Sequence, residues 1–327
     1  MITHGLPALA LAPMDGITDA PMREYLGHWG AFCYAVSEFV RVSIHPLPAK
    51  VFEREVPELK NQGRTGSGLP VQVQILGGDP ENMARSAVAA VRAGARSIDI
   101  NFGCPAPTVN RNDGGASLLR FPCRIREVVA SVRSAVPQEI PVSAKLRLGW
   151  EDIDDIDENA AMAIEGGANW LTLHARTRVQ GYQPPVYWPK VGEIRARSGV
   201  PVVANGDIWN LEDFLRCQEE TGCQHFMIGR SALANPGLSH QIAAELGIPT
   251  HNQPPQTWPE AFQAFIAISQ KYEGYSPIRA LHRLKQWSSL AHRFGEFPHF
   301  DQFKRAESLE DAMKMVRMGN SCVPSTP

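Results

Sequence analysis

Short apolar runs recur along the first 230 residues in two alternating forms. One form opens on an apolar residue followed by proline, and its four copies begin at Leu6, Leu69, Ile140 and Val200. The other form opens on glycine and a small residue, and its four copies begin at Gly30, Gly94, Gly167 and Gly222. Because the two sets interleave, the pattern predicts eight buried strands in regular succession.

Helical stretches separate most of these runs. The segments PENMARSAVAAVRAG and DENAAMAIEGGA both begin with acidic or capping residues, continue as an Ala-rich apolar period and reach glycine at the end. Eight strand–helix repeats fit a (β/α)8 TIM barrel, an α/β fold, better than an open doubly wound sheet. Residues 41–68 lack a clean helical period, so we expect an extended loop there over the active face.

A second unit follows the barrel. The run IPTHNQPPQTWP after Gly247 breaks both periodicities and predicts a linker. Helical patterning then returns over residues 260–271, 277–294 and 307–318, which predicts a small all-helical domain. The expected division is a barrel domain over residues 1–246, a linker over 247–259 and a helical domain over 260–327, with a frayed ending GNSCVPSTP.

Composition narrows the class of protein only slightly. The 327 residues are 43% hydrophobic and 20% charged, with a formal net charge of −2, so any nucleic-acid surface must be local. Six cysteines, with no CxxC pair and no His cluster at metal-ligand spacing, indicate reduced thiols in a cytoplasmic protein without a metal site. The N-terminal run LPALALAPM is too short to cross a membrane and predicts a strand.

Polar residues gather near the C-terminal ends of the expected strands, all in one alternating phase. They are Gln72, Gln74, Asp99, Asn101, Lys145, Arg147, His174, Arg176 and Asn205. In a closed barrel one phase points inward, and an unpartnered polar group there costs roughly 1–3 kcal/mol. Any single member could be a satisfied structural group, but polar side chains at one level on five strands favour a ligand at the C-terminal mouth.

The turns after the last two strands are typical of a phosphate site. Gly206 follows the seventh strand, and Gly229 and Arg230 follow the eighth. Barrels commonly hold phosphate at this place with backbone N–H groups and a helix start. The alternative interpretation is that these residues only form turns and bind no phosphate.

Several motifs, in order along the chain, resemble those of the flavin-dependent tRNA-dihydrouridine synthases. They are APMDGITD (12–19), SEFVRV (37–42), VQVQILG (71–77), NFGCP (101–105), KLRLGW (145–150), LHAR (173–176), ANGDI (204–208) and IGR (228–230). Within that family, SEFVRV with the segment after it and RLKQW (283–287) look like the bacterial C-type enzymes, which are understood to act on uridine 16 of the D loop.

The resemblance implies FMN across the barrel mouth and NADPH as the reductant. It implies cofactor contacts at Pro13, Met14, Asp15, Gln74, Lys145, His174, Asn205, Gly206, Asp207, Gly229 and Arg230. Physical chemistry agrees for several of them. An inward ammonium at Lys145 favours the negative charge of a reduced flavin, and Arg230 suits a phosphate.

Cys104 is the expected catalytic residue. Reduction of a uracil 5,6 double bond needs a hydride at C6, from flavin N5, and a proton at C5 from the opposite face. A thiol with a pKa near 8.5 is mostly protonated at pH 7 and can donate that proton. An isolated cysteine is more often a small buried hydrophobe, but its place in NFGCP at a strand end favours catalysis.

The tail is expected to bind tRNA. Residues 274–295 contain no acidic residue, and a helical wheel gathers Arg279, His282, Arg283, Gln286 and Arg293 on one arc. We expect tRNA contacts at Arg279, Arg283, Lys285 and Gln286, joined by Arg41 from the loop after the second strand. Asn101 and Arg176 are expected to hold the uracil or the flavin edge, and Arg147 the RNA phosphate or ribose. The alternative for the tail is a plain solvated face.

These observations predict a monomeric enzyme that reduces a D-loop uridine, with U16 favoured. One alternative is an FMN barrel oxidoreductase acting on a free pyrimidine or an enone, which would not need the cationic tail. Others are a catalytically silent RNA-binding barrel and a colourless phosphate-binding lyase.

Overall fold

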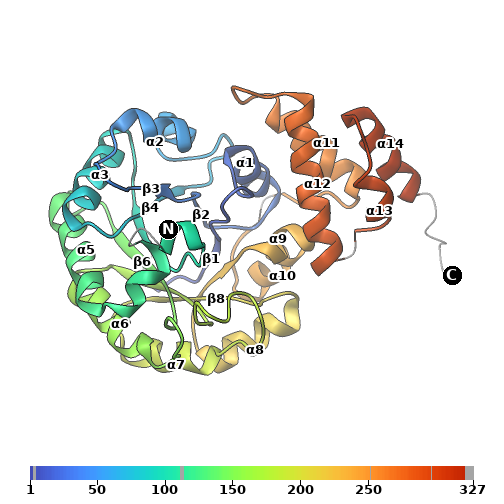
Figure 1. Cartoon of the computed structure of the whole chain (residues 1–327). Coiled ribbons are helices and arrows are strands. Elements are labelled where there is room, and N and C mark those ends of the chain that lie inside the picture. The colour runs from blue at the N-terminus through green and yellow to red at the C-terminus, as the bar shows by residue number, and fades with distance from the viewer. Residues whose placement is uncertain (3–4, 111–113, 251, 296, 321–327) are drawn as a thin grey trace.

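The computed structural model describes residues 1–2, 5–110, 114–250, 252–295 and 297–320, and a closed parallel barrel occupies its larger part (Figure 1). Its strands are β1 (Ala8–Leu11), β2 (Tyr34–Val36), β3 (Val40–Arg41), β4 (Val71–Leu76), β5 (Ile98–Phe102), β6 (Val142–Arg147), β7 (Trp170–His174), β8 (Val202–Asn205) and β9 (His225–Ile228). The sheet runs β2-β1-β9-β8-β7-β6-β5-β4-β3, and β2 and β3 both pair with β4. These two short strands therefore share one barrel position, which confirms the eight-stranded TIM barrel.

Helices surround the barrel in the expected alternation. They are α1 (Ala20–Trp29), α2 (Ala49–Glu55), α3 (Pro80–Arg92), α5 (Pro122–Ala135), α6 (Asp155–Glu165), α7 (Trp188–Arg197), α8 (Leu211–Thr221), α9 (Arg230–Ala234) and α10 (Leu238–Glu245), with the short α4 (Pro107–Asn110) at the mouth. Capping residues begin several of them, because the side chains of Asp19, Asp79 and Asn210 each accept a backbone N–H of the first turn. None of the helices in the described ranges is long and apolar enough to span a bilayer.

The prediction of an extended loop over residues 41–68 is wrong. Arg41 lies in β3 beside Leu76, and the segment then forms α2 and a 3-10 helix, Pro57–Asn61. Glu58 of this 3-10 helix receives two hydrogen bonds from Arg23 at 2.7 and 2.8 Å, and both side chains are buried. The two helices are too short to show a clear apolar period, and a contact between residues far apart in sequence holds them in place.

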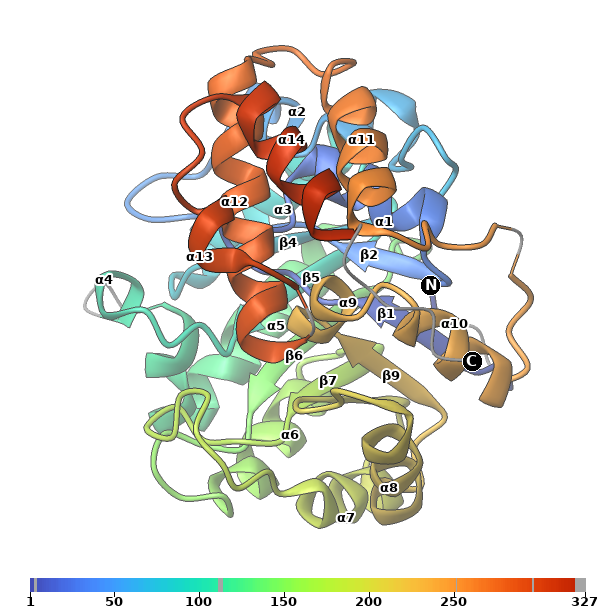
Figure 2. The ribbon, with the colours of Figure 1, turned by 90° about the vertical axis from the view of Figure 1, so that its right-hand side faces the viewer.

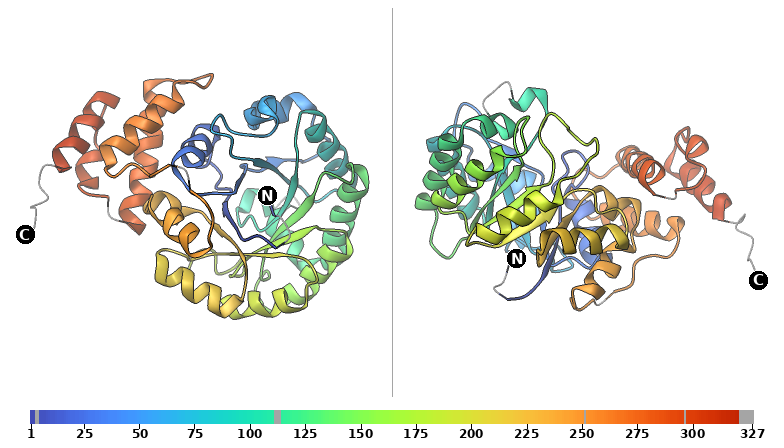
Figure 3. Two further views of the ribbon diagram at one scale, coloured as in Figure 1. Left: turned by 180° about the vertical axis from the view of Figure 1, so that it is seen from behind. Right: turned by 90° about the horizontal axis from the view of Figure 1, so that it is seen from below.

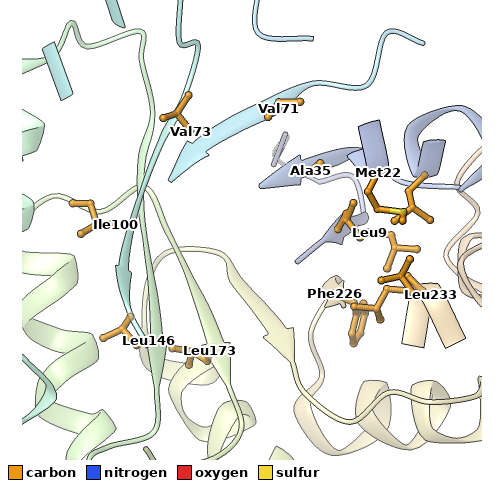
Figure 4. Close-up of a cluster of buried hydrophobic side chains, with 14 of the residues drawn as sticks. Leu9, Met22, Ala35, Val71, Val73, Ile100, Leu146, Leu173, Phe226 and Leu233 are labelled. Atoms are coloured by element: carbon orange, nitrogen blue, oxygen red, sulfur yellow. The ribbon is translucent and has the colours of Figure 1, made fainter. Parts of the chain in front are cut away.

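The two phases of each strand have different surroundings. Leu9, Ile100, Leu146 and Phe226 belong to the phase that packs outward against the helices, as Figure 4 shows, and all four side chains are fully buried. The inward phase is small or apolar along β1, and it carries polar side chains from β4 round to β9, including Asn205 of β8 and His225 of β9. The barrel interior therefore offers polar groups around most of its circumference.

Among the described residues, four helices form the C-terminal part, which stands beside the barrel next to α1 and α9 (Figures 1 and 3). They are α11 (Trp258–Ser269), α12 (Pro277–Phe294), α13 (Phe300–Phe303) and α14 (Leu309–Asn320). An aromatic cluster of Trp258, Phe262, Phe297 and Phe303 packs their inner faces. The three predicted helices are present and α13 was not predicted, while residues 321–327 of the expected frayed ending lie outside the described residues.

Candidate active site

A hydrogen-bonded layer crosses the barrel below its mouth. Asp99 of β5 accepts hydrogen bonds from Ser143 at 2.5 Å and from the Gln74 amide at 2.7 Å. Gln74 in turn accepts from the Asn101 amide at 2.8 Å. Burial raises the pKa of the Asp99 carboxyl, opposed by these hydrogen bonds and by Lys145. The polar groups are thus largely satisfied by one another, which fixes their positions.

Asn101 also shapes the turn that carries Cys104. Its side-chain oxygen accepts the backbone N–H groups of Gly103 and Cys104, both at 2.9 Å. The Cys104 carbonyl accepts the Ala116 N–H at 3.1 Å, next to Gly115, whose φ is +59°. Asn101 is 8% exposed, and its amide oxygen positions the Cys104 turn, while its NH2 group, which carries two N–H donors, gives one of them to Gln74.

The Cys104 thiol is half-buried at the mouth. Burial raises its pKa, while a backbone hydrogen bond from Ala106 works in the opposite direction. A raised pKa keeps the thiol protonated at neutral pH, which is the form that a general acid requires.

Lys145, on β6, reaches past β7 to a residue of β8. Its ammonium donates to Asn205 of β8 at 3.0 Å, and the Asn205 amide donates to the Met227 carbonyl at 2.8 Å. Burial and the nearby Arg147 lower the pKa of Lys145, and Asp99 opposes this. The lysine therefore brings a poorly solvated ammonium to the mouth beside β8.

His174 and Gly206 are in close contact. Burial, together with the cationic groups of Arg147, Lys145, Arg176 and Arg230, holds the pKa of His174 well below its usual range, so the imidazole is neutral. Gly206 has φ +114°, and a Cβ there would lie 2.7 Å from the His174 Cδ2. Only glycine fits this approach.

Arg230, at the start of α9, lies among aromatic rings. Its guanidinium carbon is 4.5 Å from the Tyr182 ring, 4.9 Å from Trp209 and 4.9 Å from Phe294, which are cation–π distances. Asp207 lies 3.6 Å from the same guanidinium. The side chain is 23% exposed, so it remains accessible to an anion at the mouth.

The β1–α1 loop faces the end of β9. Pro13 and Met14 are half-buried and Asp15 is exposed. A Cβ at Gly229 would lie 3.2 Å from the Met14 sulfur, so the loop and the glycine approach closely. The structure thus brings these expected cofactor residues to the same mouth as Lys145 and Arg230.

Three arginines predicted to contact RNA, uracil or flavin each have protein partners in the structure. Arg147 is 2% exposed and donates to the carbonyls of Gly103 at 2.9 Å and Gly181 at 2.7 Å. Arg176 is fully buried and pairs with Asp207. Arg283 pairs with Asp19 at 2.9 Å. The helical wheel and strand phase predicted the direction of these side chains without revealing the groups that meet them.

The other expected RNA residues lie at the surface. Arg279 and Gln286 are exposed on α12, and Lys285 is half-buried. Arg279 donates to the Gly274 carbonyl at 2.9 Å. Arg41 is half-buried in β3 and donates to the Thr108 carbonyl at 3.2 Å beside the mouth.

Sequence reasoning missed two residues at the mouth. Tyr182 is 53% exposed, and its ring also lies 5.3 Å from the Arg147 guanidinium carbon. Its loop has no periodic pattern, so the one feature of the sequence that could have pointed to Tyr182 is an aromatic side chain between Gly181 and Gln183. Glu38, in SEFVRV, accepts the Ile17 N–H at 3.0 Å, and burial raises its pKa to about 7. Within the described ranges no cluster of three His, Cys, Asp or Glu side chains could hold a metal.

Comparison with known proteins identifies the family. The family model described as "Dihydrouridine synthase (Dus)" matches residues 10–321. The tRNA-dihydrouridine(16) synthase of Shewanella oneidensis is 43% identical over 314 residues, covering 94% of this chain and 96% of the relative. That of Haemophilus influenzae is 41% identical over 307 residues, covering 92% and 96%.

A third relative, the tRNA-dihydrouridine(16) synthase of Vibrio parahaemolyticus, is 43% identical over 311 residues, covering 94% of each chain. A solved structure titled "QR15, an Aldolase" matches with a TM-score of 0.47 at 14% identity, over 73% of this chain and 92% of that chain, too distant a likeness to bear on function. The family model spans nearly the whole barrel and the C-terminal helices, including the NFGCP turn and the Lys145 strand. The chain therefore belongs to the dihydrouridine synthase family.

Proposed function

We propose that this protein reduces uridine 16 in the D loop of tRNA to 5,6-dihydrouridine, with FMN as cofactor and NADPH as reductant. The names of its relatives support both the reaction and the position. The relatives match over almost their full lengths, so the proposal covers the whole chain.

The mouth residues fit an FMN. A flavin phosphate suits Arg230, which is partly exposed and stands at a helix start beside Gly229. Lys145, held by Asn205, suits the ring edge that becomes negative on reduction. Gly206 lets the backbone approach closely, and His174 is a neutral hydrogen-bonding ring beside it. When bound, FMN supplies the hydride for uracil C6.

The thiol of Cys104 donates the proton to uracil C5. The observation that carries the proposal is this thiol, protonated by burial and held at the mouth by the Asn101 bonds to its turn. After the transfer the thiolate is left close to Arg147 and Arg41, whose charges favour the anion. A proton from water then restores the acid.

We propose that catalysis belongs to a barrel domain over residues 1–246 and tRNA binding to a helical domain over 260–327. Arg279, Lys285 and Gln286 on α12 contact the RNA, and Arg41 joins them from the barrel. Exposure of Arg279 and Gln286 supports this surface, and the absence of acidic residues across 274–295 favours a polyanion. A cytoplasmic monomer that meets free tRNA is the simplest form of the protein.

The decisive experiment maps dihydrouridine in tRNA from cells that have and lack this chain, complemented with the native protein or with Cys104→Ala. Loss of dihydrouridine at position 16, restored only by the native protein, is the expected result. Unchanged position 16 would refute the proposal. Reduction of a free pyrimidine with no tRNA phenotype would favour the rival oxidoreductase, and rescue by Cys104→Ala would favour a non-catalytic thiol.

A further inference from the structure

Helix α12 packs directly along α9, the short helix that begins at Arg230 (Figure 2). The Trp287 indole donates to the Leu233 carbonyl at 2.9 Å, and both groups are buried. At the end of α12, Gly295 leaves no room for a Cβ beside the Ala234 carbonyl. The C-terminal helix is therefore in close contact with the element that carries the expected phosphate-binding arginine.

A second contact joins α12 to the β1–α1 loop. The Arg283 guanidinium donates to the Ile17 carbonyl at 2.6 Å and to the Gly16 carbonyl, and it pairs with Asp19 at 2.9 Å. It also donates to Gln286 at 2.6 Å. The side chain is 19% exposed, and both of its terminal nitrogens are occupied by protein groups. This arginine is bound to the barrel and is poorly placed to meet a phosphate of RNA.

The loop that Arg283 holds is fixed from the barrel side as well. Glu38 accepts the Ile17 N–H at 3.0 Å, and within the loop the Thr18 hydroxyl accepts the Met14 N–H at 2.8 Å. Ile17 is thus bonded at its N–H by the barrel and at its carbonyl by α12. Because Met14 lies against Gly229, a shift of this loop would change the width of the mouth where the flavin is proposed to bind.

Phe294 provides the other point of support. Its ring stacks on Trp209 with centroids 4.5 Å apart and planes 14° apart, and it lies 4.9 Å from the Arg230 guanidinium carbon. Trp209 and Tyr182 of the barrel complete the aromatic surroundings of Arg230. One face of this enclosure is therefore supplied by α12.

We propose that α12 is part of the cofactor site, with Arg283 positioning the Pro13–Asp15 loop and Phe294 positioning Arg230. This inference rests on the proposed FMN-dependent function. It assigns to the C-terminal helix a role in holding the flavin that is separate from its role in binding tRNA. Arg283 and Phe294 are positioning residues, because they act through the loop and through Arg230.

The test is a titration of the apo form of the full-length protein with FMN, in which the quenching of flavin fluorescence measures binding. Arg283→Met removes all four contacts, and the affinity for FMN should fall by about tenfold or more, equivalent to about 1.4 kcal/mol. Arg283→Lys can still reach Asp19 but cannot bond both carbonyls, and it should give an intermediate affinity. Phe294→Leu should weaken binding about two- to fivefold, the equivalent of one cation–π contact of roughly 0.5–1 kcal/mol.

Two variants serve as controls. Arg126→Met removes an arginine that also joins two elements, α5 and α6, through Glu165 at 2.8 Å. Phe303→Leu loosens the aromatic core of the C-terminal helices without touching the loop or Arg230. Both should keep the affinity of the native protein for FMN.

The outcomes separate the two proposals. If the native protein binds no FMN, the proposed function itself fails. If the native protein binds FMN and Arg283→Met binds it equally well, the positioning role is wrong, and a loss of tRNA affinity alone would return Arg283 to the RNA surface. An equal loss of FMN in Phe303→Leu would also overturn the inference, because it would reduce the effect to general loosening of the helices.

Discussion

Replacing Gly206 by alanine tests the geometry of the mouth most directly. A Cβ at this position would lie 2.7 Å from the His174 Cδ2 and 3.1 Å from its Nε2, against a normal separation of about 3.5–4.0 Å. The Gly206 carbonyl accepts the Trp188 indole N–H at 3.0 Å, so the backbone cannot move away without losing that hydrogen bond. The imidazole must therefore be displaced.

Two contributions set the magnitude. Holding a non-glycine residue at φ +114° costs about 1–3 kcal/mol, and the overpacking against His174 adds about 1–3 kcal/mol. Gly206→Ala should thus lower the free energy of unfolding by about 2–6 kcal/mol. Gly68→Ala is the matched control, because Gly68 has φ +92° and a Cβ added there would meet no atom within 4 Å, so only the backbone contribution applies.

Urea unfolding followed by tryptophan fluorescence measures both variants, and bound FMN is measured after purification. We expect Gly206→Ala to be less stable than Gly68→Ala by about 1–3 kcal/mol and to retain less flavin. Adding His174→Ala to Gly206→Ala should recover the overpacking part of the loss, which a double-mutant cycle isolates. Equal urea midpoints for Gly206→Ala and Gly68→Ala would refute the reasoning.

Three further predictions concern titration and charge. Cys104→Ala should lower the rate of single-turnover uracil reduction by a factor of about 10²–10⁴. In the native protein this rate should stay constant through neutral pH and fall only above the raised pKa of the thiol. A native-like rate in the variant would rule out Cys104 as the acid. Glu38 has a folded pKa of about 7, above its unfolded value, so its protonated form favours folding at low pH and stability falls as pH rises toward 7. In urea unfolding, the free energy of unfolding of Glu38→Gln minus that of the native protein should therefore be about 2–3 kcal/mol larger at pH 8 than at pH 5. The same difference at both pH values would contradict the raised pKa. Lys285→Glu should weaken tRNA binding and reduce the slope of log affinity against log salt by roughly 0.7–0.9 for the lost contact, whereas an unchanged slope would place this lysine off the RNA surface.

Local pattern was sufficient for the barrel and for the composition of its mouth. Strands buried in a parallel barrel read as short apolar runs, and the inward phase alternates with period two, so Gln74, Asp99 and Lys145 could be assigned to one face from sequence alone. The amphipathic period gave the bounds of α12, and the NFGCP turn placed Cys104 at a strand end.

Only the tertiary structure decided what these side chains meet. Glu58 lies 35 positions from Arg23, and the carbonyls of Gly16 and Ile17 lie 267 and 266 positions from Arg283. Periodicity reports which face of an element is buried or exposed, and it carries no information about a partner so far along the chain. The helical wheel placed Arg283 on the polar arc of α12, and only the packing of α12 against α9 and the β1–α1 loop reveals the barrel carbonyls that it bonds.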